Sequence, residues 1–156
     1  MKKILVFIIG LVVAGVMTVQ AQSAETLYKE GKALYDAKNY TAAFPKLKAA
    51  AEKGHRKAQY RLGRCYDKGH GVAENDETAF LWYSKSAAQD YAKAQYRVGK
   101  CYMKGKGTTA DEKKATTWLT RAVKNPKGGN ELLAKLRKEA SENDEDAKKI
   151  LKLIGK

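Results

Sequence analysis

The side chains best suited to chemistry are cations that recur at matching positions along the chain. They are Lys29, Lys32, Arg61, Arg64, Lys68, Arg97, Lys100 and Lys104. Arg61, Arg64 and Lys68 have the i, i+3, i+7 spacing of one helix face, and the same arrangement returns 36 residues later. Stacked helices would align these cations into rows that repel one another. An acidic ligand would relieve this repulsion, and arginine can bind a carboxylate or phosphate through two hydrogen bonds. The pattern therefore predicts a binding site for acidic groups.

The alternative interpretation of these cations is a solvated charged face that binds nothing. Their repetition would then reflect duplication of one unit. In the shorter unit upstream, Asp36 stands where the later units have Lys68 and Lys104, so the third row is mixed in charge.

Residue patterns typical of catalysis or metal binding are scarce. His55 and His70 each stand alone, without cysteine or histidine at ligand spacing, and the few serines lack a nearby histidine. Acidic residues such as Asp76 and Glu77 fall where helices are expected to begin, where the helix dipole favours them. We therefore predict a protein that is not an enzyme and that has no metal and no cofactor.

Two segments that would position the cations repeat each other at an offset of 36 residues. Residues 57–69 (KAQYRLGRCYDKG) match residues 93–105 (KAQYRVGKCYMKG), and the match continues to Trp82 and Trp118. A period of this length is typical of a solenoid of stacked units. Each unit has the apolar periodicity of two helices, with glycines ending the first of them.

These signals divide the chain into a leader and one all-α domain, because strand signals are scarce. We expect a secretory signal peptide over 1–21 and a helical repeat domain over 22–156. Within that domain we expect a tetratricopeptide-like unit at 25–54, repeats at 55–91 and 92–127, and C-terminal capping helices at 128–156. Capping elements are needed because a solenoid must cover its terminal core.

The first residues have the order of a secretory signal. Lys2 and Lys3 precede an apolar run from Ile4 to Val16, and Val19 and Ala21 then place compact residues at the two sites that a signal peptidase reads. The alternative is a membrane anchor, but the run is shorter than the roughly 20 residues that span a bilayer. We expect a protein of the periplasm or the extracellular space, with no stable membrane insertion once the signal is removed. The net charge of +14 favours acidic partners, and an exported protein is not expected to bind nucleic acid.

The repeats resemble the Sel1-like repeat family, a branch of the tetratricopeptide superfamily. In the first repeat the resemblance rests on Ala58, Leu62, Gly63, Tyr66, Gly69, Gly71, Val72, Asp76, Ala79, Trp82, Tyr83, Lys85 and Ala87. In the second it rests on Ala94, Val98, Gly99, Tyr102, Gly105, Gly107, Asp111 or Glu112, Ala115, Trp118 and Ala122. The resemblance implies a right-handed α-solenoid of antiparallel helix pairs. It also implies that the first helix of each pair lines a groove that holds proteins or peptides.

We accordingly predict a scaffold that binds a protein or peptide, with an acidic partner in the cell envelope. Some exported relatives of the family have been proposed to bind or cleave β-lactam compounds. One alternative is therefore a cell-envelope enzyme acting on β-lactam or peptidoglycan-like substrates. Another is an adaptor for anionic envelope polymers.

The cysteines, Cys65 and Cys101, occupy equivalent positions one repeat apart. Equivalent points on packed helices lie roughly 8–10 Å apart, whereas a disulfide needs Cα atoms within about 7 Å. Both cysteines also fall on the apolar face of their helices. We predict two buried free thiols, since free cysteine is among the most buried residue types.

Overall fold

The structure is a computed structural model that describes residues 22–156, and all regular secondary structure in this range is helical. The helices are α2 (Ala24–Asp36), α3 (Tyr40–Glu52), α4 (Arg56–Lys68), α5 (Asp76–Ala88), α6 (Ala92–Lys104), α7 (Glu112–Lys124), α8 (Gly129–Ser141) and α9 (Glu145–Leu153). The expected signal peptide at 1–21 lies outside the described residues. In the described part of the chain, no helix is long and apolar enough to span a bilayer.

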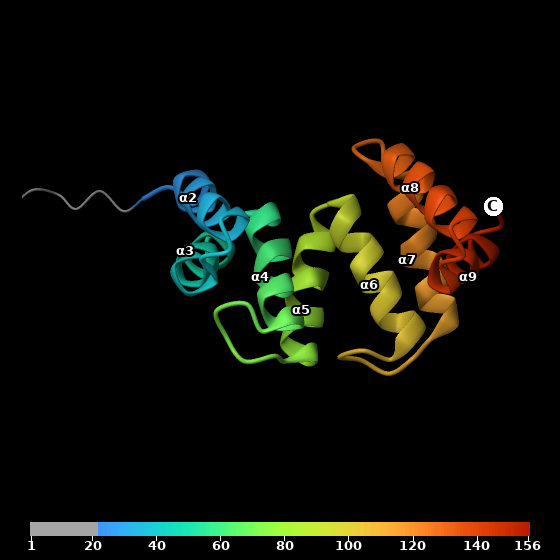
Figure 1. Ribbon diagram of the computed structural model, residues 1–156, viewed down its shortest axis with the longest axis horizontal. Coiled ribbons are helices and arrows are strands. Elements are labelled where there is room, and N and C mark those ends of the chain that lie inside the picture. The colour runs from blue at the N-terminus through green and yellow to red at the C-terminus, as the bar shows by residue number, and fades with distance from the viewer. Residues whose placement is uncertain (1–21) are drawn as a thin grey trace, which may run out of the picture.

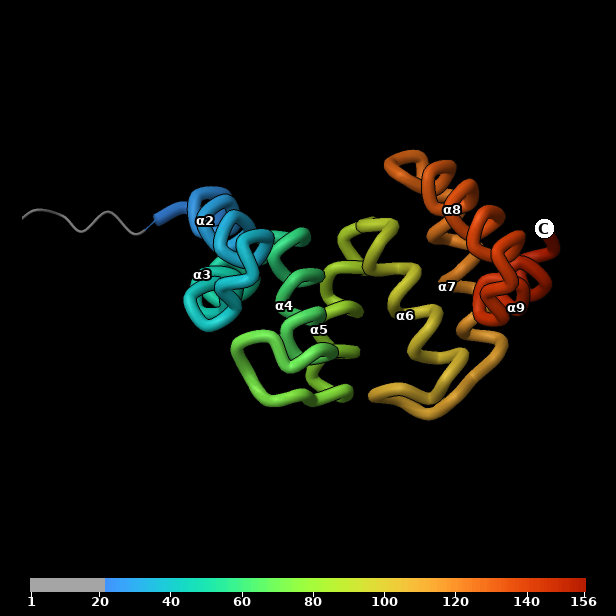
Figure 2. The backbone as a smooth tube through the Cα atoms, viewed as in Figure 1, coloured from blue at the N-terminus to red at the C-terminus, as the bar shows by residue number. Residues whose placement is uncertain are grey.

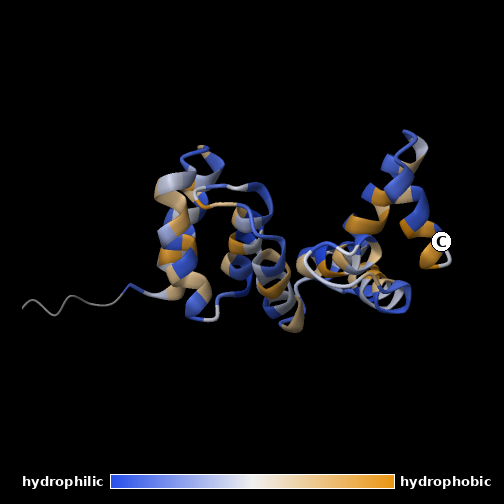
Figure 3. Ribbon diagram, turned by 90° about the horizontal axis from the view of Figure 1, so that it is seen from below, coloured by the Kyte–Doolittle hydropathy of each residue, from blue (hydrophilic) through white to orange (hydrophobic). Residues whose placement is uncertain are grey.

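Consecutive helices pair into hairpins that stack in chain order. The pairs α2–α3, α4–α5, α6–α7 and α8–α9 pack within hairpins, while α3–α4, α5–α6 and α7–α8 join one hairpin to the next (Figures 1 and 2). Viewed from below, the array of hairpins follows a bent path between its two ends (Figure 3). The predicted all-α solenoid of antiparallel helix pairs is confirmed.

Polar side chains define where most of the helices begin. Asn75, Asp111 and Asp144 each accept a hydrogen bond from a backbone N–H three residues ahead, at 2.8 Å. Such caps satisfy donors that the first turn leaves without partners. The first helices of the two repeats end at Gly69 and Gly105, both left-handed, as their glycines predict.

Close packing within the two repeat hairpins, α4–α5 and α6–α7, depends on a glycine in the first helix of each. Gly63 lies directly beneath the ring of Tyr83, where an added Cβ would come within 2.6 Å of the ring. Gly99 lies beneath Leu119 in the same way, also at 2.6 Å. A missing side chain on one helix thus makes room for a large one on its partner, and Tyr83 and Leu119 are each 1% exposed.

Cys65 and Cys101 are both free and buried in the core, which confirms the prediction made for them. Burial raises the pKa of each thiol to about 11. The nucleophilic thiolate is therefore scarce at neutral pH, and both cysteines act as small apolar side chains.

Amide side chains link successive hairpins at the end where the first helices begin. Gln59 of α4 donates to the Ala51 carbonyl of α3 at 3.2 Å, and Gln95 of α6 donates to the Ala87 carbonyl of α5 at 3.5 Å. Within the hairpins, Gln89 and Asn125 donate to the Oε1 atoms of the same two glutamines, at 2.8 and 3.1 Å. These amides fix the register of neighbouring hairpins with groups that carry no charge.

Candidate functional site

The predicted cations lie on α2, α4 and α6, the first helices of three successive hairpins. We call Lys32, Arg61, Arg64, Lys68, Arg97, Lys100 and Lys104 the cationic face. Their side chains do not form uninterrupted rows of like charge. They gather instead around aspartates that neutralise part of the charge.

Asp36 organises the cationic face between α2 and α4. Its carboxylate lies 2.6 Å from Lys32 Nζ and 3.1 Å from Arg61 Nη1. The guanidinium groups of Arg61 and Arg64 also lie over the ring of Tyr35, at 5.2 and 5.4 Å from its centroid. Such cation–π contacts strengthen when water is excluded, and the side chain of Arg61 is 16% exposed. Arg64 has no carboxylate oxygen of the described residues within 4.0 Å.

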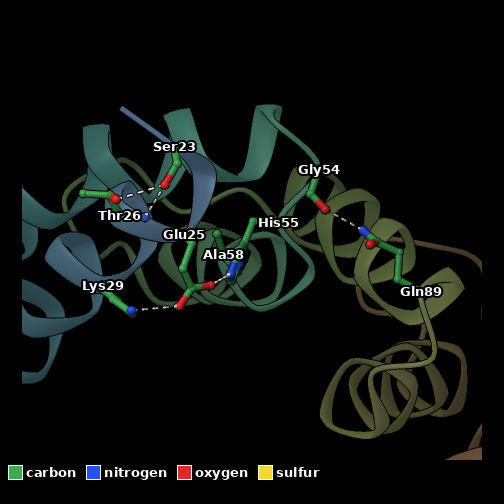
Figure 4. A network of polar contacts seen from close by, with 8 residues as sticks. All are labelled: Ser23, Glu25, Thr26, Lys29, Gly54, His55, Ala58 and Gln89. Atoms are coloured by element: carbon green, nitrogen blue, oxygen red, sulfur yellow. Dashed lines mark hydrogen bonds and ion pairs between the residues drawn. The ribbon is translucent and has the colours of Figure 1, made fainter. Parts of the chain in front are cut away.

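Lys29, which was predicted to begin one of the rows, lies apart from the cationic face. Its side chain is 72% exposed and sits 3.6 Å from Glu25 (Figure 4). Glu25 in turn accepts a hydrogen bond from His55 Nε2 at 2.9 Å. The other ring nitrogen of His55, Nδ1, accepts from the Ala58 N–H and so caps the start of α4. Among the described residues no hairpin covers α2 from the N-terminal side, which leaves Lys29 exposed where its counterpart Arg61 is enclosed.

Asp146 links the C-terminal hairpin, α8–α9, to the cationic face through ion pairs. It lies in the first turn of α9, 3.0 Å from Lys100 and in ion-pair contact with Lys104. Sequence reasoning missed this contact, because the residues after 128 carry no repeat that would place α9 against α6. A shared carboxylate also reduces the charge that Lys100 and Lys104 present to a ligand.

The loops that follow the first helices join successive hairpins with different chemistry. In the first repeat the His70 ring stacks on Tyr40, with centroids 3.8 Å apart, and its Nδ1 lies 2.9 Å from the Tyr35 hydroxyl. In the second repeat, 36 residues later, Lys106 contacts Asp67 and lies 3.2 Å from Asp76. One junction is aromatic and the other is ionic.

A pocket of about 170 Å³ opens between α4 and α6. Its lining residues are Asp67, Lys68, Tyr83, Arg97, Lys100, Cys101, Lys104 and Lys106. Four members of the cationic face therefore meet at one hollow. The sequence pattern pointed to Lys68, Arg97, Lys100 and Lys104 but not to Asp67 or Lys106. Lys106 is equivalent in sequence to His70, so the repeat does not indicate that Lys106 contacts two carboxylates. Only the structure shows these contacts.

Asp67 on α4 and Asp146 on α9 lie beside the cationic face, and both are held in the charged form. The hydrogen bond from Lys104 lowers the pKa of Asp146 below its ordinary value of 3.8. Burial alone would raise the pKa of Asp67, but the hydrogen bond and charge of Lys106 outweigh burial and lower it.

We expect the melting temperature to fall when the pH drops below about 4, because the folded-state pKa values of these carboxyls are depressed. Their ion pairs stabilise the fold fully above the unfolded-state pKa, and this contribution disappears as the pH falls through the lower folded-state values. Circular dichroism melts between about pH 6 and 2 would measure it. Asp146→Asn should show a shallower decline, and an identical pH profile for both proteins would contradict the assignment.

Within residues 22–156 no group of three or more histidine, cysteine, aspartate or glutamate side chains is arranged to hold a metal ion. His70 carries a pKa lowered by burial and by the nearby Arg64 and Lys68. Its hydroxyl partner belongs to Tyr35, whose pKa is raised by burial, so this pair lacks an activated nucleophile. The arrangement is suited to binding acidic groups through hydrogen bonds and charge.

Stacked antiparallel hairpins define an α-solenoid scaffold. The family model of the Sel1 repeat matches residues 56–91 and 92–126, which contain the hairpins α4–α5 and α6–α7. The chain belongs to the Sel1-like repeat family.

Comparisons with known proteins place similar repeats in several bacteria. The sequence is 41% identical to the exopolysaccharide production negative regulator of Rhizobium meliloti (strain 1021) over 59 residues. These residues make up 38% of this chain and 22% of that protein. The fold is similar to a Sel1 repeat protein from Oxalobacter formigenes, with a TM-score of 0.65 and 30% identity over 86% of this chain and 65% of that one. It is also similar to a protective antigen of uropathogenic Escherichia coli strains displaying an SLR fold. For that antigen the TM-score is 0.64 and the identity 24%, over 85% of this chain and 29% of that one. The chain spans less than two thirds of each of these relatives.

Proposed function

We propose that this Sel1-like repeat scaffold binds a protein or peptide partner by its acidic groups, through the cationic face of α2, α4 and α6. The observation that supports the proposal most is the gathering of Lys68, Arg97, Lys100 and Lys104 around one pocket. Side chains from two hairpins meet there, and a ligand bound in the pocket would contact both.

The charge balance of the cationic face favours an acidic partner over a neutral one. Asp36 is shared by Lys32 and Arg61, and Asp146 by Lys100 and Lys104, so each carboxylate faces two cations. Cations left in excess repel one another at close range, and a bound carboxylate reduces that repulsion. Hydrogen bonds between charged groups are about twice as strong as neutral ones, and their geometry also orients the bound ligand.

We further propose that the partner belongs to the cell envelope. The support is the order of basic, apolar and small residues in the first 21 positions, which is typical of export. Fractionating cells that express the full chain, and sequencing the N-terminus of the recovered protein, tests this part. Recovery of uncleaved protein with the cytoplasmic fraction would oppose it.

The binding proposal predicts that Arg64→Glu with Lys100→Glu weakens binding of a fluorescent poly-glutamate peptide at least about tenfold, since two attractive charges become repulsive. Fluorescence anisotropy would measure the affinity, with a poly-glutamine peptide as the uncharged reference. Lys57→Glu with Lys93→Glu is the matched control, because it makes the same charge change at exposed positions of α4 and α6.

Binding that falls equally in both double variants would show that net charge alone attracts the peptide, and it would contradict the proposed site. Tighter binding to an anionic polysaccharide such as alginate than to the peptide would favour the polymer-adaptor function instead. In that case a steep dependence on salt, without preference among acidic peptides, is expected.

A further inference from the structure

Arg97, like Arg64, is a cation of the cationic face without an ion pair among the described residues, and the groups that act on its guanidinium include the Tyr60 hydroxyl and the more distant charge of Asp67. It lines the pocket between α4 and α6, and its side chain is partly buried. No carboxylate oxygen of the described residues lies within 4.0 Å of its guanidinium. A partly buried guanidinium offers five N–H donors and no acceptor, so it retains unused capacity to bind an anion.

The nearest carboxylate in the pocket is already engaged by other groups. Asp67 Oδ2 accepts from the Tyr83 hydroxyl at 3.3 Å, and Oδ1 contacts Lys106 Nζ. Lys68 Nζ lies 4.0 Å from the same carboxylate. Asp67 is therefore committed to holding the junction between the two repeats together, and it does not pair with Arg97.

The size of the pocket limits what it can hold. Sites for drug-sized ligands are typically about 300–1,000 Å³, and this pocket measures about 170 Å³. A single carboxylate or phosphate group fits such a volume, whereas the rest of a peptide would have to lie outside it.

We propose that the pocket is a subsite for one oxyanion group, a carboxylate or a phosphate, with Arg97 as its principal ligand and Lys68 and Lys104 beside it. The inference rests on the proposed function, because it names the group of the partner that the cationic face takes in.

Asp146 sets the affinity of this subsite from the C-terminal hairpin. It holds Lys100 at 3.0 Å and contacts Lys104, so it competes with an incoming oxyanion for the same ammonium groups. Removing its charge frees both lysines for the ligand. The first turn of α9 thus acts as an internal competitor, and loss of that charge tightens binding.

Titration of the protein with inorganic phosphate and with acetate, followed by amide NMR, tests the subsite. We expect saturable shifts in α4 and α6, an affinity at least about tenfold weaker in Arg97→Gln, and about threefold tighter binding in Asp146→Asn. Lys93→Gln, on the exposed side of α6, is the matched control and should leave the affinity unchanged. Stronger binding of phosphate than of acetate would identify a phosphorylated group as the ligand, and the reverse order a carboxylate.

Equal affinity in the wild type and in folded Arg97→Gln, or shifts scattered over all exposed lysines, would overturn the subsite. If Arg97→Gln fails to fold, Arg97→Lys keeps the charge but loses the paired donors, and an affinity unchanged in that variant would overturn it equally. Failure of the subsite is distinguishable from failure of the proposed function. Poly-glutamate binding that needs Arg64 and Lys100 but ignores Arg97 would remove the subsite alone. Anion binding at Arg97 without any peptide binding would remove the function alone.

Discussion

Replacing Gly107 by alanine should destabilise the protein by about 3 kcal/mol or more, equivalent to roughly 10 °C in melting temperature for a chain of this size. A Cβ at this position would come within 2.0 Å of the Asp76 carbonyl oxygen, and φ is +67°. The clash is with backbone at the start of α5, which cannot rotate away as a side chain would. The loop would have to lift, and the ion pairs of Lys106 with Asp67 and Asp76 would be lost with it.

Gly54→Ala separates the two causes of this effect. Gly54 also has a positive φ, +84°, but nothing lies within 4 Å of its added Cβ. Its replacement should therefore cost only the strain of the left-handed backbone, about 1–2 kcal/mol. Thermal melts of both variants would show the difference, and equal losses would mean that the close approach of loop and helix contributes nothing.

Tyr83→Ala should destabilise the protein by about 3–5 kcal/mol, the range found when a buried aromatic side chain is removed. The side chain is 1% exposed and fills the space above Gly63. Its hydroxyl also donates to the buried carboxylate of Asp67 at 3.3 Å. The substitution opens a cavity within the first repeat and removes a hydrogen bond from the junction to the second.

Tyr83→Phe is the matched control for that cavity. It keeps the ring above Gly63 and removes only the hydrogen bond to Asp67, so we expect a loss of about 1 kcal/mol. Urea denaturation would give both free energies of unfolding. A Tyr83→Ala variant no less stable than Tyr83→Phe would show that packing above Gly63 does not hold the hairpin closed.

The repeated parts of the fold could be predicted from the sequence, because a residue type that recurs at the same place in both copies marks the same structural role. Gly69 and Gly105 predicted the ends of the first helices in the two repeats, and the structure confirms these ends. The repeated Gly63 and Gly99 are the positions where the second helices pack closely. The apolar positions of Cys65 and Cys101 likewise predicted two buried free thiols.

The carboxylates that balance the cationic face could not be predicted, because they depend on contacts between elements. Asp146 belongs to a segment without a repeat, so its position against Lys100 and Lys104 follows from how α9 folds back. No pattern in the sequence indicated a role for Asp67. Its partner Lys106 lies in a loop, where helical periodicity does not predict which way a side chain points.

Acidic clusters were interpreted from the sequence as residues that begin helices, and this is only part of their role. Asp76 opens α5, but its side chain also receives Lys106 from the loop of the following repeat. Asp146 lies in the first turn of α9 and also pairs with two lysines of α6. A residue can satisfy a local preference and a tertiary contact together, and the sequence pattern reports only the first.

The amides that join hairpins where the first helices begin give the two edges of the array different responses to solvent. The bonds of Gln59 to the Ala51 carbonyl and of Gln95 to the Ala87 carbonyl join neutral groups, so added electrolyte or acid leaves their attraction nearly unchanged. At the opposite end, the contact of Lys106 with Asp67 is weakened by both. Concentrated salt should therefore loosen the array at the loop end while the amide end keeps its spacing. The angle between the second and third hairpins would then vary with ionic conditions.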